Sequence, residues 1–119
     1  MTRRPTTVRL RTSLFEDATA IMRAEFSQPL TIDAIATRVL TSRRQLQRSF
    51  EEIGSTTFRA YLTAVRMEVA ARLLRQHGAT VREAAHAVGY RQPAQFAKAF
   101  RRHHGVAPSA LRTPPQPQT

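Results

Sequence analysis

One pattern of residues occurs twice in this sequence, about 50 positions apart. Residues 31–54 read TIDAIATRVLTSRRQLQRSFEEIG, and residues 80–105 read TVREAAHAVGYRQPAQFAKAFRRHHG, with one extra residue in the middle of the second copy. The pairs that match in type are Thr31/Thr80, Ile32/Val81, Ala36/Ala85, Val39/Val88, Gln45/Gln95, Leu46/Phe96, Arg48/Lys98 and Phe50/Phe100. Because type and order match through both halves, each copy is expected to form the same small structural unit.

Helix signals are dense along the chain, and strand signals are absent. Apolar residues recur three and four positions apart, and no Asn-Gly or Asp-Gly hairpin turn occurs. The expected N-cap residues are Ser13, Thr31, Ser42, Thr56 and Thr80, and Glu83, three residues after Thr80, predicts a capping box there. The four glycines, Gly54, Gly78, Gly89 and Gly105, each follow a helical pattern, where a left-handed residue ends a helix. The sequence predicts an all-α fold of about seven helices, near residues 14–27, 32–39, 43–53, 57–77, 81–88, 93–104 and 108–112.

Each copy of the pattern combines a short helix, a tight turn and a longer helix, which is a helix-turn-helix. We call residues 31–54 the first repeat and residues 80–105 the second repeat. A small residue in each short helix, Ala36 or Ala85, allows the longer helix to cross it closely. The fold class predicted is therefore all-α, with two helix-turn-helix units joined by a long linker helix at about 57–77.

The charge of the chain indicates a polyanionic partner. Its 119 residues include 19 Lys+Arg and 8 Asp+Glu, which gives a formal net charge of +11 at pH 7. A strongly basic surface binds nucleic acid or an anionic membrane surface. No apolar stretch is long enough to span a bilayer, so we expect no membrane-spanning segment. Basic charge and the helix-turn-helix repeat are independent signals, and both favour double-stranded DNA.

Catalysis and metal binding have little support in the sequence. The chain has no cysteine, which excludes disulfides, thiolate metal sites and cysteine nucleophiles. The adjacent residues His103 and His104 would point about 100° apart on a helix, which makes them a poor pair of metal ligands. The acidic residues are few and scattered. We expect no enzymatic activity, no cofactor and no metal site.

The longer helix of each repeat divides into an inward face and a DNA-facing side. The inward sets are expected to be Leu46, Ser49, Phe50 and Ile53 in the first repeat, and Phe96, Ala99, Phe100 and His103 in the second. The opposite stripe of the first repeat is Arg44, Gln47, Arg48 and Glu51. The side chains expected to read bases are Arg44, Gln47, Arg48, Ala94, Gln95 and Lys98. Those expected to contact the DNA backbone are Ser42, Arg43, Thr56, Thr57, Thr80, Arg91, Arg101 and Arg102.

The linker helix is long enough to separate the two repeats along DNA. About 20 residues at ~1.5 Å each span roughly 30 Å, close to the ~34–36 Å of one DNA turn. One chain, acting as a monomer, could place two recognition helices in successive major grooves. We expect direct base reading mainly from the first repeat, and backbone positioning mainly from the second.

The two ends of the chain are expected to lie outside this fold. Residues 1–12 contain four arginines and no acid, and we expect a flexible basic tail there. Residues 113–119 read TPPQPQT, and their three prolines predict a disordered tail. The expected DNA-binding domain is then residues 13–112.

The residues that pattern this domain resemble those of the AraC/XylS family of transcription regulators. The second half carries the signature V-G-Y-x5-F-x3-F-x4-G-x2-P-x3-R, from Val88 to Arg112. The first half and the linker match at Ala36, Ser42, Leu46, Arg48, Phe50, Gly54, Phe58, Tyr61, Leu62, Arg66, Ala70, Leu73 and Leu74. The resemblance covers about residues 13–112. Pro93, Ala94 and Ala97 depart from it, since many members have polar residues there.

The resemblance implies a sequence-specific transcription regulator, an activator that binds promoter DNA and contacts RNA polymerase. It implies a cytoplasmic protein associated with the bacterial nucleoid. Most members also carry an effector-binding or dimerisation domain, for which this chain has no room. The chain is therefore either a stand-alone regulator or the DNA-binding end of a longer protein, and the sequence leaves both open.

Two other functions remain open at this point. A nucleoid-architectural protein that bends DNA with weak sequence preference would also be basic. A protein-interaction module would use the helices to bind a regulator or a polymerase subunit, with DNA secondary. The ratio of specific to non-specific DNA affinity, and its dependence on salt, separates the three.

Overall fold

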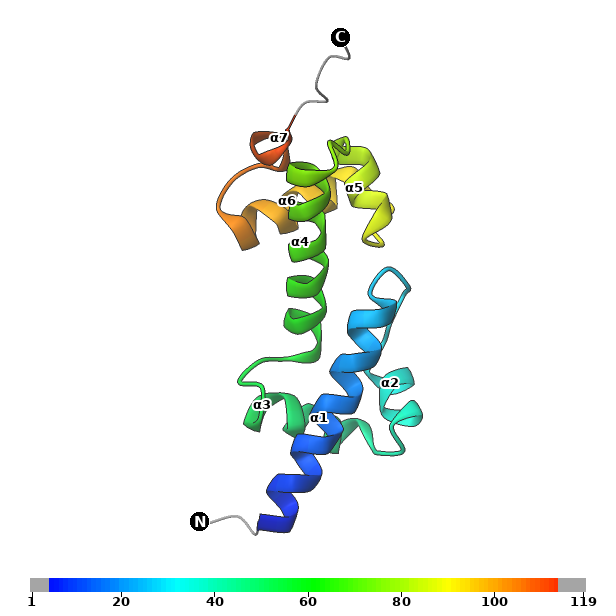
Figure 1. Ribbon diagram of the computed structural model, residues 1–119. Coiled ribbons are helices and arrows are strands. Elements are labelled where there is room, and N and C mark those ends of the chain that lie inside the picture. The colour runs from blue at the N-terminus through cyan, green and yellow to red at the C-terminus, as the bar shows by residue number, and fades with distance from the viewer. Residues whose placement is uncertain (1–4, 114–119) are drawn as a thin grey trace. The chain divides into compact units, whose positions relative to one another are not determined.

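The computed structural model describes residues 5–113, and within this range it contains seven α-helices and no strand (Figure 1). The helices are α1 (Pro5–Glu25), α2 (Ile32–Arg38), α3 (Arg43–Glu52), α4 (Phe58–Gln76), α5 (Val81–Ala87), α6 (Pro93–His104) and α7 (Pro108–Leu111). The prediction of an all-α fold with seven helices is confirmed. None of the described helices is both long and apolar enough to cross a membrane.

The chain divides into two compact units, with the boundary inside α4 after Leu62. The N-terminal unit contains α1, α2, α3 and the first residues of α4, and the C-terminal unit contains the rest of α4 with α5, α6 and α7. Each repeat of the sequence therefore lies in a unit of its own.

The core of the N-terminal unit forms around the longer helix of the first repeat. Phe50 is fully buried, and its ring makes edge-to-face contacts with Phe15, Phe58 and Tyr61 at centroid distances of 5.1, 5.8 and 5.9 Å. Edge-to-face pairs at these distances are the favoured aromatic arrangement. The buried residues of this core are Ala18, Met22, Ile35, Ala36, Leu46, Phe50 and Leu62. Helix α1 supplies two of them and contacts both α2 and α3.

The start of α1 differs from the sequence-based prediction. The helix begins at Pro5, so residues 5–12, expected as a flexible tail, are helical. Arg11 is 6% exposed, and its guanidinium forms an ion pair with Glu52 near the end of α3. The prediction placed the helix start near residue 14 because the early residues show no apolar stripe. An ion pair between residues 41 positions apart leaves no trace in the local pattern. Residues 1–4 and 114–119 lie outside the described part.

The core of the C-terminal unit contains both aromatic residues predicted for the second repeat. Phe96 and Phe100 are fully buried, and their ring centroids lie 5.6 Å apart. The expected inward position of His103 is wrong, because His103 is exposed and His104 turns inward instead. The ring of His104 lies 4.4 Å from that of Phe100, and its Nε2 is 3.0 Å from the main-chain oxygen of Met67. The predicted inward face of α6 was therefore shifted by one residue at this end of the helix.

The turn of each repeat is the same left-handed helix ending. In the first repeat, the Leu40 N–H donates to the Thr37 carbonyl and the Thr41 N–H to that of Ala36. In the second, Gly89 and Tyr90 make the same two bonds, to His86 and Ala85. This pair of bonds defines the Schellman motif, whose left-handed residue is usually glycine. The φ angles are +59° at Leu40 and +96° at Gly89.

The glycine after α3 serves a different purpose from the one predicted. Gly54 has no positive φ, and the left-handed residue there is Ser55, at φ +51°. A Cβ atom on Gly54 would lie 2.7 Å from Cζ of Phe15 and 3.0 Å from the carbonyl oxygen of Phe50. Gly54 is therefore required by the close approach of Phe15 to the end of α3. The expected left-handed conformation is present at Gly78, Gly89 and Gly105.

Candidate nucleic-acid interface

The recognition helix of the first repeat, α3, is fixed by its cap and its buried face. The Oγ of Ser42 accepts a hydrogen bond from the Gln45 N–H at 3.1 Å, so Ser42 is the N-cap. Leu46, Ser49 and Phe50 are buried as predicted, and the Ser49 hydroxyl donates to the Gln45 carbonyl. These contacts set the rotation of α3 and thereby select which side chains face solvent.

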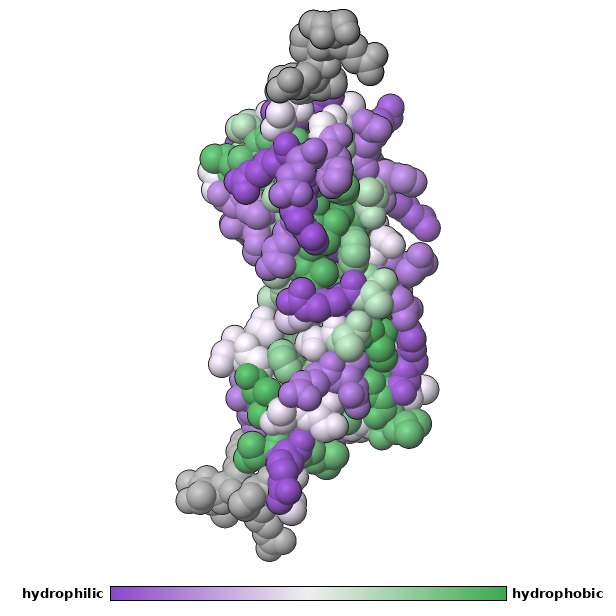
Figure 2. Space-filling view, in the orientation of Figure 1, coloured by the Kyte–Doolittle hydropathy of each residue, from purple (hydrophilic) through white to green (hydrophobic). Residues whose placement is uncertain are grey.

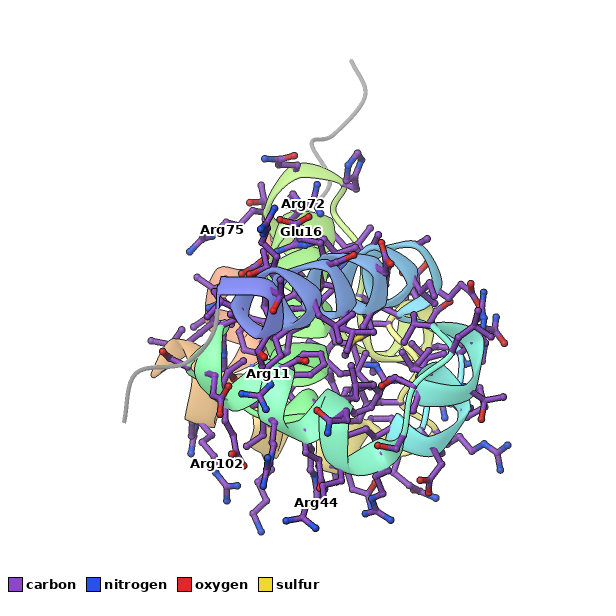
Figure 3. The ribbon with its side chains drawn as sticks, turned by 90° about the horizontal axis from the view of Figure 1, so that it is seen from below. Arg11, Glu16, Arg44, Arg72, Arg75 and Arg102 are labelled. Carbon is purple, nitrogen blue, oxygen red and sulfur yellow. The ribbon has the colours of Figure 1, made fainter. Side chains whose placement is uncertain are left out.

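The predicted base-reading residues of the first repeat share the solvent side of α3. Arg44 and Gln47 are exposed, and Arg48 is partly exposed. The Arg44 side chain extends away from the helix (Figure 3). Arg43 precedes them and lies 3.5 Å from the carboxylate of Asp33. Both side chains of this ion pair are largely solvent-exposed, so breaking the pair to let Arg43 contact a phosphate would cost little free energy.

A hollow of about 240 Å³ lies beside this side of α3. Its lining combines α2, α3 and the start of α4, in the residues Ile32, Arg43, Gln47, Glu51, Thr57, Phe58 and Arg59. The hollow thus places Gln47, a predicted base reader, near Thr57, a predicted backbone contact. Arg59 was not among the predicted contacts, although its position in the first turn of α4 could have suggested it. Glu51 brings a carboxylate to the same surface.

Thr57, and not Thr56, is the residue that caps α4. The Thr57 Oγ1 accepts a hydrogen bond from the Ala60 N–H at 3.1 Å. Three hydroxyl residues in a row, Ser55, Thr56 and Thr57, made the sequence ambiguous here. Thr56 instead takes part in the end of α3, where its main-chain N–H donates to the Phe50 carbonyl at 3.1 Å.

The recognition helix of the second repeat, α6, begins with proline. Pro93 occupies its first turn, and Gln92 makes no side-chain cap. Ala94, Gln95 and Lys98 are exposed, opposite the buried residues Phe96 and Phe100. The predicted backbone contacts Arg91, Arg101 and Arg102 are exposed as well. The structure thus brings the predicted contacts of α6 together on its solvent side.

Thr80 is engaged in the capping box that the sequence predicted for α5. Its Oγ1 accepts from the Glu83 N–H at 3.0 Å, and its own N–H donates to Glu83 Oε1 at 2.9 Å. The hydrogen bonds from Thr80 to the Glu83 carboxylate hold the pKa of that carboxylate below its ordinary 4.5. Thr80 therefore has a definite structural role, in which both its N–H and its hydroxyl are engaged with Glu83.

Arginines of the C-terminal unit occur on two of its sides. Arg72 and Arg75 of α4 point away from the side of this unit on which Arg102 lies (Figure 3). On the visible face of both units, hydrophilic residues alternate with hydrophobic areas (Figure 2). Arg66 of α4 is different, because it stacks under Tyr90 at 5.8 Å and its partial burial lowers its pKa. In residues 5–113, no group of three His, Asp or Glu side chains is arranged to hold a metal ion.

Comparison with known proteins places this arrangement in a family. Residues 35–113 match the family model described as a helix-turn-helix domain. The regulator GbdR of Pseudomonas aeruginosa, named an HTH-type transcriptional regulator, is 30% identical over 93 residues, which are 78% of this chain and 25% of that protein. The chain thus spans about a quarter of the length of this relative.

Solved structures give the same result. A transcriptional regulator from Chromobacterium violaceum, described as having an AraC-type DNA-binding domain, matches with a TM-score of 0.80 and 30% identity, over 84% of this chain and 89% of that one. The DNA-binding domain of the global transcriptional factor AdpA, solved in complex with a target DNA, matches with a TM-score of 0.77 and 28% identity, over 82% of this chain and 88% of that one. These matches favour a regulator over an architectural protein. The chain belongs to the family of AraC-type helix-turn-helix DNA-binding domains.

Proposed function

We propose that this chain is the DNA-binding part of a transcription regulator, and that it places α3 and α6 in successive major grooves of promoter DNA. The observation that carries the proposal is the shared construction of the two repeats. Each longer helix buries a face that includes a fully buried phenylalanine, Phe50 or Phe100, and exposes cationic and amide side chains opposite. The net charge of +11 supplies the attraction to phosphates that such binding needs.

The exposed side chains of α3 have the chemistry of direct readout. Arg44 and Arg48 can each make two hydrogen bonds to guanine, and Gln47 can do the same with adenine. On α6, Gln95 and Lys98 have donors for base edges, and Ala94 fits against a thymine methyl group. Since α6 presents fewer long side chains, we infer that the first repeat reads more of the sequence.

The remaining candidate residues are those that would contact the DNA backbone. The capping hydroxyls of Ser42 and Thr57 accept from main-chain N–H groups and keep a hydrogen to donate to a phosphate oxygen. Thr80, the third candidate, would have to exchange its hydroxyl bond to the Glu83 carboxylate for one to a phosphate. Thr56 lies beside Thr57, at the start of α4. The cations in this role are Arg43, Arg91, Arg101 and Arg102, all exposed.

The regulator acts as an activator in the bacterial nucleoid, through contact with RNA polymerase. Two recognition helices on one chain allow it to occupy its site as a monomer. The complex of the related AdpA domain with target DNA supports double-stranded DNA as the partner.

Selection of binding sites from a random duplex library, at about 150 mM salt, tests the proposal. Two short blocks with centres about 10–10.5 base pairs apart are expected. A single block would contradict base reading by both helices. Absence of enrichment, with tight binding that disappears on adding salt, would indicate a non-specific architectural protein instead.

The salt dependence of binding tests the protein-interaction alternative. The logarithm of the affinity should fall with the logarithm of the salt concentration, by about 0.9 per phosphate neutralised. A domain that serves only to bind another protein would lack this dependence on DNA phosphates.

A further inference from the structure

Leu40 combines two unfavourable features that nothing within the fold offsets. Leu40 is 93% exposed, which makes it the most exposed of the large apolar residues on the surface of residues 5–113. Its φ of +59° lies in the left-handed region, where a side chain bearing a Cβ is strained. Burial would repay such strain, but the Leu40 side chain is not buried.

The second repeat shows that the turn does not need this leucine. Gly89 occupies the matching position, makes the matching hydrogen bonds and has the matching left-handed backbone. Glycine adopts this conformation without steric cost. The leucine of the first repeat is therefore an addition to a turn that works without it, and a strained position at a binding surface suggests a role in binding.

Leu40 lies in the turn just before the N-terminal end of α3, the end that is best placed to reach base edges. It precedes the N-cap Ser42 by two residues and the exposed Arg44 by four. In a helix-turn-helix, the first turns of the recognition helix reach the base edges in the major groove. Leu40 is thus close in the chain to the proposed DNA-reading side of α3.

The surroundings of Leu40 favour DNA over a protein as its partner. Next to it in the chain, Thr37 and Arg38 are exposed, and Thr41 is partly exposed. The core of a protein interface needs a cluster of apolar and aromatic side chains, and an isolated leucine does not provide one. The thymine C5-methyl is a single small apolar group that the major groove presents.

We propose that Leu40 contacts the C5-methyl group of one thymine at the edge of the site bound by the first repeat, and so selects thymine there. This inference rests on the proposed function, because it needs α3 in the major groove. It adds a specificity-determining residue outside the recognition helix itself.

The test uses a selected duplex in which each thymine is replaced in turn by deoxyuridine, which lacks only the methyl group. Wild-type protein should lose about three- to fivefold in affinity at one thymine, as expected for one methyl group returned to water. Leu40→Ala and Leu40→Gly should bind the thymine and deoxyuridine forms of that position equally. Each variant should match the affinity of wild type for the deoxyuridine duplex.

The two variants separate the contact from the backbone strain. Both remove the apolar side chain, but only Leu40→Gly relieves the left-handed conformation, so only it should raise the melting temperature. Equal loss of thymine preference in both variants would therefore assign the effect to the side chain. A loss confined to one variant would overturn the proposal.

The remaining outcomes also decide between explanations. If wild type selects a two-block site but the variants keep its full thymine preference, Leu40 does not contact that methyl group, while the proposed function stands. If Leu40→Ala lowers transcription without changing DNA affinity, the partner is a protein and the DNA contact is refuted. If wild type selects no site, both the proposed function and this inference fail.

Discussion

Replacing Gly54 by alanine should destabilise the N-terminal unit through a steric conflict with Phe15. The new Cβ would lie 2.7 Å from Cζ of Phe15 and 3.0 Å from the carbonyl oxygen of Phe50. The ring of Phe15 has little room to move, since it packs at 5.1 Å on Phe50 and at 6.0 Å on Tyr61. Overpacking of this kind costs about 1–3 kcal/mol.

The backbone contributes in the opposite direction and more weakly. Gly54 has no positive φ, so alanine meets no conformational barrier there. Alanine also restricts the unfolded chain, which stabilises the fold by about 0.4–1 kcal/mol. The net loss is about 1–2 kcal/mol, and for a domain near 100 residues this lowers the melting temperature by roughly 5–15 °C.

Urea denaturation followed by circular dichroism measures this loss. Gly105→Ala is the control, because its Cβ would meet nothing within 4 Å while its φ of +78° makes the cost purely conformational. Phe15→Leu should relieve the conflict, so the double variant with Gly54→Ala should lose less than the sum of the single losses. Equal midpoints for wild type and Gly54→Ala, or simple additivity with Phe15→Leu, would refute the packing argument.

Three further predictions concern charge. Arg48→Ala should cost about 1–3 kcal/mol at a preferred site and relax one base position; a uniform loss on all duplexes, measured by titration, would make Arg48 a phosphate contact instead. Glu51→Gln should raise affinity for every duplex by about two- to fivefold at low salt, because the Glu51 carboxylate repels phosphates. An equal gain from Glu16→Gln on α1 would contradict the placement of Glu51 close to the bound DNA. Hydrogen bonds from Arg38 lower the pKa of Glu25 below its ordinary 4.5, so this pair stabilises the fold above about pH 4.5 and loses that effect as the pH falls through the lowered pKa. Urea denaturation across pH should show Glu25→Gln less stable than wild type at pH 7 and closer to it in acid, and a constant difference would contradict the linkage.

The elements that could be predicted from the sequence are those encoded by local patterns. The apolar spacing around Leu46 and Phe50 fixed the inward face of α3, and Thr80 with Glu83 marked the start of α5 through a capping box. The solvent exposure of Arg44 and Gln47 follows from the same periodicity, because burying one face of a helix exposes the other.

The elements that could not be predicted depend on contacts between distant residues. The first turns of α1 carry no apolar stripe, and Arg11 is buried against Glu52, which lies 41 positions away. Gly54 was expected to adopt a left-handed conformation, but its role depends on where the ring of Phe15 lies. Helix propensity and apolar periodicity depend on neighbouring residues in the chain. They therefore gave no signal for the contact of Arg11 with Glu52 or of Gly54 with Phe15.

The two repeats agree where their residues are buried and differ where they are exposed. Leu46 and Phe50 of α3 correspond to Phe96 and Phe100 of α6, and all four are fully buried. The exposed positions correspond less closely: Gln45/Gln95 and Arg48/Lys98 keep their type, but Arg44 has the small Ala94 as its counterpart. Because burial constrains size and shape while exposure does not, the repeat preserves a scaffold and leaves each solvent side free to differ. We therefore propose that sequence preference resides in the unequal solvent sides, and the longer donors of α3 are the reason we assign most base reading to the first repeat.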